Sequence, residues 1–245
     1  MSDIKTALVT GGTGGIGTAI CRALSKQGLN VVANYHPMEA DNIEAWQAAQ
    51  KADGFEFDVV PADVSSFDSC KEMIESLAAP VDVLVNCAGI TRDASMKKMD
   101  VSQWDAVIRT NLDSVFNVTK QVFAGMTERG FGRVVNISSV NGQRGQFGQT
   151  NYSAAKAGMH GFTMALAQEG AAKGVTVNSV SPGYVQTAMT DMIPDEIKEA
   201  IIATVPMKRM GTVEEIADAV AYLTSDSAAY VTGQNLGING GFFMS

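Results

Sequence analysis

Residues 6–17, T-A-L-V-T-G-G-T-G-G-I-G, decide the fold of this chain. A short apolar run ends in a cluster of glycines, after which Ile20, Ala23 and Leu24 recur at helical spacing until Gly28. This change of period predicts a strand, a glycine turn and a helix. In an open α/β sheet, the helix after the first strand can bind a pyrophosphate through its free N–H groups and its dipole. The glycines alone could form only a tight turn, but their place between strand and helix favours a dinucleotide site, and no G-K-[ST] follows to suggest a P-loop.

Short apolar runs and helical segments alternate along the rest of the chain. This alternation is typical of βαβ units, whose right-handed crossovers bury a parallel sheet between two helix layers. We therefore expect the α/β class: a single-domain Rossmann fold over residues 1–245, with a doubly wound seven-stranded parallel sheet and helices on both faces. The strands are expected at residues 6–10, 31–33, 55–60, 81–86, 133–137, 175–180 and 235–238.

The segments between these runs predict helices, a loop and a lid. Thr212 and Glu215 have the T-x-x-E spacing of a capping box, which predicts a helix start. Residues 141–149 are rich in Gly and Gln and predict a loop, and Ser181-Pro182-Gly183 predicts a turn. The polar, Met-rich residues 185–211 are expected to form a small substrate lid, or else to pack on the core. The other helices are expected around Trp46 and at residues 67–77, 101–127 and 150–173.

The composition excludes several classes of protein. Hydrophobic residues make up 46% of the chain and charged residues 18%, which supports a buried core and argues against disorder. The net charge of -8 argues against nucleic-acid binding, which needs clustered Lys and Arg on one face. No apolar run approaches the length of a membrane span, and Met1 to Lys5 leads directly into an apolar strand without a signal-like segment. We expect no membrane partner and a cytoplasmic location.

The cysteines and histidines suggest neither disulfides nor a metal site. Cys21, Cys70 and Cys87 are odd in number and widely spaced, which fits a reducing compartment, and we expect all three to be small core residues. His36 and His160 are too few and too far apart in sequence to indicate metal binding. A solvated loop position is expected for His36 and a helix-face position for His160.

The segment Ser138 to Lys156 carries a candidate for proton transfer. If a helix starts at Thr150, Tyr152 and Lys156 lie at i and i+4 on one face. The Lys156 ammonium should then lower the pKa of the Tyr152 phenol from its usual value of about 10. An isolated Y-x-x-x-K pair is more often a surface feature. Ser153 to Lys156 also matches S-x-x-K of penicillin-binding enzymes, but neither S-D-N nor K-T-G accompanies it.

Several of these motifs together resemble the short-chain dehydrogenase/reductase family, over the whole chain. Residues 10–17 are similar to its cofactor turn, and Asn86-Cys87-Ala88-Gly89 to its N-N-A-G element, with Cys87 in place of the second Asn. Pro182-Gly183 with Thr187 resembles its nicotinamide-side motif. The catalytic tetrad that the resemblance implies is Asn111, Ser139, Tyr152 and Lys156.

The resemblance implies an NAD(P)H-dependent reductase in which each residue of the tetrad has its own role. Tyr152 would donate a proton to a carbonyl oxygen, Ser139 would hydrogen-bond that oxygen, and Asn111 would anchor a water relay towards Lys156. Asp63, after the third strand, resembles the family's adenine contact, and its alternative role is a simple strand-end cap. The cofactor-binding residues expected are Gly11, Thr13, Gly15, Ile16, Gly17, Asn34, Tyr35, Asp63, Val64, Asn86, Ala88, Gly89, Tyr152, Lys156, Pro182, Gly183, Val185 and Thr187.

The end of the second strand should decide between NADH and NADPH. A 2'-phosphate needs Arg or Lys there, whereas residues 34–39, N-Y-H-P-M-E, contain neither. The resemblance implies NADPH, but Asn34 and Tyr35 could bond either ribose, and Glu39 would repel a phosphate if it pointed inward. His36 could partly offset that repulsion. We predict good use of NADH.

A narrower resemblance concerns the substrate. Residues 86–93 and 139–152 look like those of the acetoacetyl-CoA reductases of polyhydroxybutyrate synthesis, which implies a short 3-oxoacyl-CoA. The loop's amides could bond its carbonyl groups, or they could simply complete the loop's own hydrogen bonds. Met189, Met192 and Met207 of the lid could close over the pantetheine. The substrate residues that the resemblance implies are Asp93, Lys98, Ser139, Gln146, Phe147, Gln149 and Tyr184.

Two alternative functions and an oligomeric state complete the expectations. A 3-oxoacyl-[acyl carrier protein] reductase would need a basic docking patch for its acidic carrier, and a non-catalytic nucleotide sensor could use the same fold. The apolar end Gly240-Gly241-Phe242-Phe243-Met244, with the family resemblance, suggests a homotetramer. Candidates for the basic patch are Arg92, Lys97, Lys98, Arg129, Lys208 and Arg209.

Overall fold

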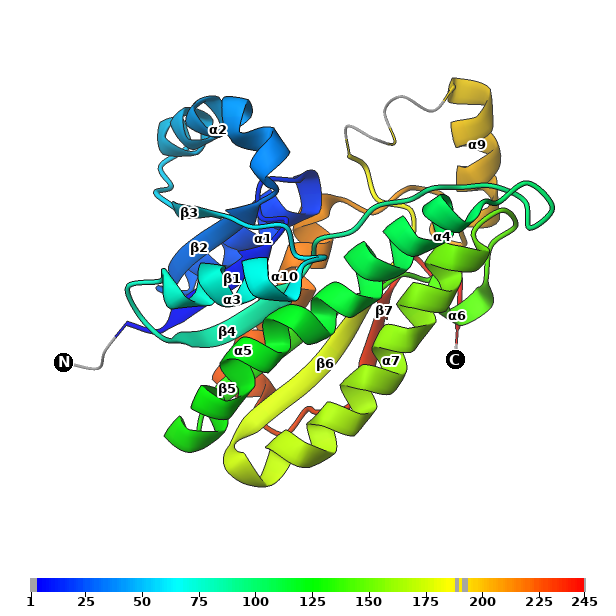
Figure 1. Ribbon diagram of the computed structural model, residues 1–245. Helices are drawn as coiled ribbons and strands as arrows, with labels where there is room; N and C mark the ends of the chain where they lie inside the picture. The colour runs from blue at the N-terminus through cyan, green and yellow to red at the C-terminus, as the bar shows by residue number, and fades with distance from the viewer. Residues whose placement is uncertain (1–3, 188–189, 191–193, 245) are drawn as a thin grey trace.

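A seven-stranded parallel sheet forms the centre of the molecule, in the order β3-β2-β1-β4-β5-β6-β7 (Figure 1). The computed structural model describes residues 4–187, 190 and 194–244. The order reverses between β1 and β4, so the carboxyl ends of these two strands flank the switch point of the sheet. The α/β class and the doubly wound sheet are confirmed. The strands are β1 Thr6–Thr10, β2 Asn30–Tyr35, β3 Asp58–Pro61, β4 Val81–Asn86, β5 Gly132–Ile137, β6 Val175–Pro182 and β7 Asn235–Ile238.

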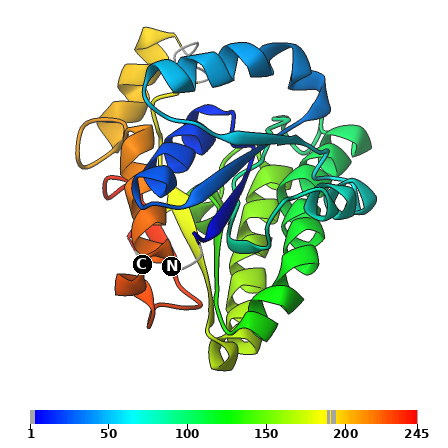
Figure 2. The same ribbon diagram turned by 90° about the vertical axis from the view of Figure 1, so that its left-hand side faces the viewer.

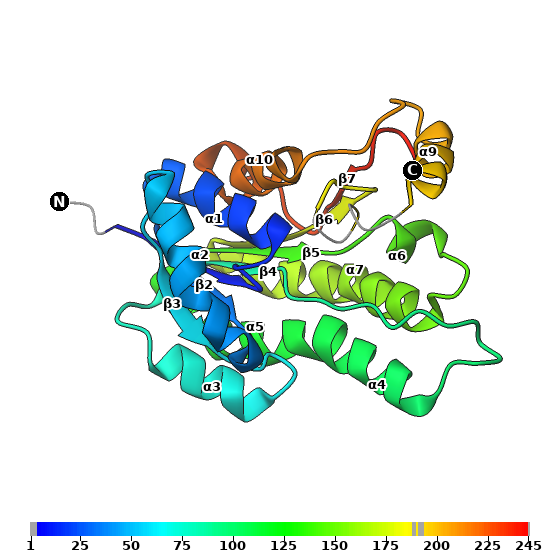
Figure 3. The same cartoon turned by 90° about the horizontal axis from the view of Figure 1, so that it is seen from above.

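Helices cover both faces of the sheet. Seen from above, α1 and α10 lie on one side, and α3, α4, α5 and α7 lie on the other (Figure 3). The view onto the β3 edge shows the same two layers with the sheet between them (Figure 2). The helices are α1 Gly15–Lys26, α2 Ala40–Ala52, α3 Phe67–Glu75, α4 Val101–Ile108, α5 Ser114–Arg129, α6 Asn141–Arg144, α7 Thr150–Gly170, α9 Asp195–Thr204 and α10 Val213–Thr224, with short turns η1 Pro37–Glu39, η2 Arg109–Asp113, η3 Ala171–Lys173 and η4 Asp226–Ala228.

Both faces of the central strands β1, β4, β5 and β6 are buried, which explains their largely apolar sequences. On β1, Ala7 and Val9 belong to the core beneath α1 and α10, whereas Leu8 belongs to the core beneath α3 and α5. Successive side chains on a strand point to opposite faces, so one short run supplies both cores. The predicted capping box forms at the start of α10, where the Thr212 hydroxyl accepts from the Glu215 N–H and the Glu215 carboxylate from the Thr212 N–H.

Several predicted boundaries are wrong, for identifiable reasons. β3 begins at Asp58, not residue 55, because the chain first leaves α2 through Gly54 and packs the Phe57 ring against Trp46, 5.7 Å between centroids. The turn predicted at 181–183 is largely strand, since Ser181 and Pro182 pair with β7. Within the predicted loop 141–149, residues 141–144 form α6, and α3 ends two residues before the predicted position.

The long helix predicted at 101–127 is not continuous. Residues 109–113 form a π-helical turn between α4 and α5, and Asn111 lies inside it, fully buried. The hydrophobic period cannot reveal such a turn, because both flanking helices continue the same pattern. π-turns occur frequently at functional sites.

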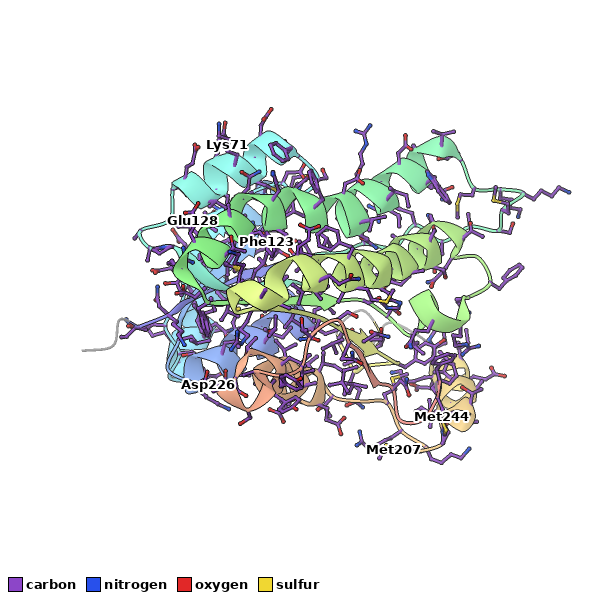
Figure 4. All side chains as sticks on the ribbon, turned by 90° about the horizontal axis from the view of Figure 1, so that it is seen from below. Lys71, Phe123, Glu128, Met207, Asp226 and Met244 are labelled. Atoms are coloured by element: carbon purple, nitrogen blue, oxygen red, sulfur yellow. The ribbon has the colours of Figure 1, made fainter. Side chains whose placement is uncertain are left out.

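The predicted lid has a defined base. Val185 and Gly211 pair as an isolated parallel bridge, so the chain between them leaves and re-enters the body at one place. α9 stands beyond the sheet layers (Figure 1), and the Met207 N–H donates to the Gly240 carbonyl over 3.1 Å. Met207 and Met244 lie at this same corner of the molecule (Figure 4). Met189 and Met192, also assigned to the lid, fall outside the described residues.

The remaining expectations concern cysteines, metals and membranes. Cys21 and Cys70 are buried as expected, whereas Cys87 is only half-buried, and all three are free thiols. In the described part of the chain, no helix is both long and apolar enough to span a bilayer. Nor do His, Cys, Asp and Glu side chains of the described residues gather in threes around a possible metal position.

Candidate active site

The glycine turn is tightly packed on one side and open on the other. Gly11 has φ +60°, and a Cβ there would lie 2.9 Å from the Cα of Ala88, while a Cβ on Gly17 would collide with the Gly11 carbonyl. Gly14 and Gly15 are exposed, and a Cβ on Gly15 would meet only the Thr187 side chain. Among the described residues, no side chain caps α1 at Gly14. The free N–H groups of this helix therefore face an open space, which fits a bound pyrophosphate.

Two buried polar side chains hold the turn in place. The Thr10 hydroxyl accepts from the N–H groups of Cys87 and Ala88, at 3.0 and 3.2 Å, which ties the turn to the end of β4. Asn34 accepts from the Gly11 N–H and donates to the carbonyls of Val60 and Ala62. Asn34 is 2% exposed, and the expected contact of this residue with a ribose stays a prediction. Its amide is used to join the turn, β2 and β3.

One acidic side chain contacts the outer end of the turn, and a second lies after the end of β3. The Thr13 hydroxyl donates to the Glu39 carboxylate over 3.1 Å, so Glu39 points toward the glycine turn. Asp63 accepts from the N–H and hydroxyl of Ser65, the strand-end capping role, and its second oxygen lies 3.9 Å from His36 Nε2. His36 is exposed on its loop, as expected. Tyr35 is half-buried at the end of β2.

The two ends of the Asn86–Gly89 segment have different surroundings, because Asn86 lies in the core and Gly89 lies at the site. The Asn86 side chain is buried and donates to Thr119 and Asn136, so its amide is used within the core, and the expected cofactor contact of Asn86 stays a prediction. Asn136 in turn donates to Thr163, which extends this polar network to α7. A Cβ on Gly89 would lie 3.4 Å from Asn111 Oδ1 and 3.5 Å from Lys156 Nζ. Gly89 therefore forms the wall beside two members of the predicted tetrad.

The remaining predicted cofactor residues line the same end of the sheet. Val64 is buried and its carbonyl accepts from Asn117, whereas Ile16 is half-buried against the core. The Gly183 N–H donates to the Ile238 carbonyl, and a Cβ on Gly183 would collide with Asn239. Val185 is buried at the lid base. Pro182 ends β6, and Thr187 faces Gly15 across the open side of the turn.

Lys156 is buried behind Tyr152. Its Nζ donates to the Ile137 carbonyl over 2.8 Å and lies 5.6 Å from the centre of the Tyr152 ring. Burial lowers the pKa of Lys156 to about 8, although the nearby Cys87 thiol acts in the opposite direction. The i, i+4 arrangement on α7 is confirmed. The ammonium is directed at the end of β5 as well as toward the phenol.

The predicted lowering of the pKa of Tyr152 is wrong for this structure. Burial raises the pKa of the phenol, and hydrogen bonding to the Ser139 side chain only partly opposes that rise. Asp93 and Cys87 raise the pKa further through charge repulsion. The physical reason is that desolvation penalises the phenolate more than a lysine 5.6 Å from the ring centre favours it. The phenol therefore keeps its proton at neutral pH.

Ser139 and Asn111 complete the predicted tetrad. Ser139 is buried at the end of β5, and its hydroxyl accepts from the Asn141 N–H over 3.1 Å. The Asn111 side chain accepts from the Ile90 N–H and donates to the Ile90 carbonyl. Both of its polar atoms are thus engaged by the backbone of one residue, which fixes the loop after Gly89. The structure brings all four tetrad residues to one end of the sheet.

The predicted substrate residues differ from one another in exposure and in their contacts. Gln149 donates to Asp93 and accepts from Asn141, so Gln149 and Asp93 serve the loop's own hydrogen bonds. Phe147 is 90% exposed and Lys98 is exposed, whereas Gln146 is half-buried. The Tyr184 ring packs on Phe242, 5.5 Å between centroids. In this structure the aromatic ring of Phe147 covers nothing.

Asn151 and Phe242 are contacts that sequence reasoning missed. Asn151 is fully buried and donates to the carbonyls of Arg92 and Gln103, which ties the start of α7 to the chain before α4 and to the first turn of α4. Phe242 also packs under the Arg144 guanidinium at 4.2 Å. An Asn in a first helical turn was a possible signal for the former. Nothing in the sequence indicates the latter, because it joins segments about a hundred residues apart.

Comparisons with known proteins agree with this geometry. A family model described as enoyl-(acyl carrier protein) reductase matches residues 11–243. The chain is 62% identical to the acetoacetyl-CoA reductase of Allochromatium vinosum over 98% of its length and 99% of that protein. It is 56% identical to the acetoacetyl-CoA reductase of Cupriavidus necator, over 98% of each. Identity to the 3-oxoacyl-[acyl-carrier-protein] reductase FabG of Haemophilus influenzae is 43%, over 98% of this chain and 99% of the relative.

The lowered pKa of Lys156 predicts a pH-dependent stability. Between pH 8 and 10.5 the unfolded chain carries a proton on this amine that the folded chain lacks, so the free energy of unfolding rises with pH there. Below about pH 8 this contribution is constant. Lys156→Met removes it, so the parent should gain about 2 kcal/mol relative to the variant between pH 7.5 and 9.5.

Denaturant unfolding of both proteins at matched concentration measures this difference, and titrations common to both cancel. Lys97→Met, at an exposed position, is the matched control and should follow the parent. A parent-minus-variant difference that stays flat across the range would contradict the burial of a charged Lys156.

Proposed function

Since the chain belongs to the short-chain dehydrogenase/reductase family, we propose that it is an acetoacetyl-CoA reductase that forms (R)-3-hydroxybutanoyl-CoA for polyhydroxyalkanoate synthesis. The observation that carries the proposal is the meeting of Ser139, Tyr152 and Lys156 beside the open glycine turn. The relatives named acetoacetyl-CoA reductase support the choice of substrate.

The chain's own residues would bind the carbonyl and supply its proton. The side chain of Ser139 lies close enough to Tyr152 to influence the pKa of the phenol, so a 3-oxo oxygen placed beside both residues can accept from both hydroxyl groups. The raised pKa keeps the phenol protonated, as a proton donor requires. Lys156 then stabilises the phenolate that remains after proton transfer. A nicotinamide dinucleotide, when bound at the glycine turn, supplies the hydride.

Tyr152→Phe tests the proton-donor role. Loss of the hydroxyl should lower kcat for acetoacetyl-CoA reduction by about a hundredfold or more, because no other acid replaces it. Binding of the reduced cofactor, followed by fluorescence, should change little. Tyr222→Phe, on the exposed face of α10, is the control and should retain parental turnover. Unchanged turnover in Tyr152→Phe would remove the phenol from the mechanism.

We propose that NADH is used in preference to NADPH. The Thr13–Glu39 hydrogen bond supports this, because it directs a carboxylate to the outer end of the glycine turn, where the adenosine ribose of a dinucleotide is expected. A carboxylate there can accept from a free 2'-hydroxyl and repels a 2'-phosphate. His36 lies 3.9 Å from Asp63, so a charge on its ring would be partly balanced by that carboxylate.

The ratio of kcat/KM for NADPH over NADH should therefore lie below one in the parent. Glu39→Gln should raise this ratio about tenfold, since it removes the repulsion but keeps a hydrogen-bonding side chain. Glu44→Gln, exposed on α2, is the charge-matched control and should leave the ratio unchanged. A parental ratio far above one would sink the NADH proposal.

The runner-up function is reduction of a 3-oxoacyl group carried on a protein. Its expected basic patch is divided in the structure. Arg129 bonds Asp82 and the Val81 carbonyl at the amino end of β4, opposite the site, and Arg209 is paired with Glu215. Lys97 and Lys98 remain exposed. This charge arrangement favours a small CoA thioester over an acidic protein.

Turnover of acetoacetyl-CoA against acetoacetyl-carrier protein separates the two functions. We expect kcat/KM to be at least about tenfold higher for the CoA thioester, because the paired arginines cannot add steering to the carrier. A higher value for the carrier-bound substrate would make fatty-acid synthesis the better assignment. Equal kcat/KM values for the two substrates would show that the divided basic patch does not affect the choice between them.

We further propose a homotetramer in the cytoplasm, with residues 185–211 as the substrate lid. The expected apolar C-terminus supports the assembly only partly, since Phe242 and Phe243 are half-buried within their own chain. A second apolar surface adds support: Phe67 on α3 and Phe116 on α5 are exposed and stacked, beside a hollow of about 490 Å³. The free thiols fit a reducing compartment. Light scattering that returned a monomer would reject the assembly.

A further inference from the structure

Three segments of the active site meet at the ring of His160. His160 lies on α7, one helical turn after Lys156, and its Nε2 is 2.8 Å from the Ser138 hydroxyl oxygen at the end of β5. The same Nε2 is 3.3 Å from the Ser181 hydroxyl oxygen on β6. Of the two histidines in the chain, this one was expected to be only a helix-face residue. Its ring instead joins the catalytic helix to two neighbouring strands.

The partners of the two serines fix the tautomer of the ring. The Ser138 hydroxyl donates its proton to the Lys156 carbonyl at 2.9 Å. The Ser181 hydroxyl donates its proton to Asn235 Oδ1 at 2.7 Å. Each hydroxyl has one proton, so both oxygens can only accept from the ring. His160 Nε2 therefore carries hydrogen and donates to both serines, while Nδ1 holds the free electron pair when the ring is neutral.

The elements that this ring joins all carry residues of the proposed reaction. Ser138 directly precedes Ser139, and Ser181 directly precedes the Pro182-Gly183 pair. The Lys156 carbonyl, bonded to Ser138, belongs to the helix that carries Tyr152. A displacement of α7 against β5 would thus change the separation of the Ser139 and Tyr152 hydroxyl groups.

We propose that His160 is a positioning residue whose Nε2–H, shared by Ser138 and Ser181, sets the spacing between Ser139 on β5 and Tyr152 on α7. The inference rests on the proposed reductase function. The ring touches neither of the two hydroxyl groups, and it acts through Ser138 and Ser181. Burial and the nearby Lys156 both lower the pKa of His160, so the ring is neutral at physiological pH. An Nδ1–H tautomer would leave both serine oxygens without a donor.

The test compares two replacements of His160. His160→Leu fills the space but cannot donate, so kcat for acetoacetyl-CoA should fall by about 10- to 100-fold through misplacement of the hydroxyl pair. The KM values for substrate and NADH should stay within about threefold, because the residues proposed to contact them are unchanged. His160→Gln can place an amide N–H near the Nε2 position and should restore kcat to within about fivefold of the parent. Thermal unfolding of all three proteins separates this effect from general destabilisation.

A second variant, at Ser181, tests the proposal even if His160→Leu does not fold well. Ser181→Ala removes one of the two acceptors and should lower kcat by about threefold or more, and the same change should add nothing in the His160→Leu background. Parental kcat in His160→Leu, an equal loss in His160→Gln, or no loss in Ser181→Ala would overturn the proposal.

The tautomer has a readout that needs no activity. Nitrogen-15 NMR of the labelled parent should show Nε2 protonated and Nδ1 unprotonated near neutral pH, and the opposite pattern would also overturn the proposal. If the parent did not reduce acetoacetyl-CoA, the proposed function would fail, whereas the ring's tautomer and its bonds to Ser138 and Ser181 would still be measurable.

Discussion

The close approach of Gly11 to Ala88 determines how the rest of the site is built. A side chain on Gly11 would lie within 2.9 Å of the Ala88 backbone, so only glycine lets the first turn meet the end of β4. Thr10 closes the contact by accepting from the Cys87 and Ala88 N–H groups. This contact lies at the switch point of the sheet, where a cofactor site and a catalytic site can adjoin. On the other side of this contact, Gly89 lies beside Asn111 and Lys156 of the predicted tetrad.

Buried amides, more than charges, hold this arrangement. Asn34 fixes the glycine turn, Asn86 and Asn136 link β4 and β5 to α7, and Asn151 ties the start of α7 to the chain before α4. An amide can donate and accept at once without the desolvation cost of a charge, so it suits positions with no exposure. The one buried ammonium in the proposed mechanism, Lys156, has its pKa lowered as a consequence.

The two halves of the predicted site differ in the contacts that their side chains make within the chain. The half that carries the predicted tetrad lies beside β4, β5 and α7, and the side chains of Asn111, Ser139 and Lys156 all have hydrogen-bond partners within the chain. The substrate half consists of the loop after α6, the predicted lid and the C-terminal segment, joined by the Arg144–Phe242–Tyr184 stack. The exposed Phe147 and the loop bonds of Gln149 show that this half is not organised around a ligand by the chain alone.

Local periodicity and spacing were enough to predict the strand–turn–helix start, the order of the elements and the i, i+4 pair on α7, because neighbours in the sequence set each of these features. It missed the π-turn at Asn111 and the start of β3, where the apolar pattern continues across a change of backbone geometry. Only the tertiary structure decided that Asn34 and Asn86 face inward, that Glu39 bonds Thr13 and that His160 joins β5 to β6. The reason is physical: a side chain's partners and solvation come from segments distant in sequence, and these set both its hydrogen bonds and its pKa.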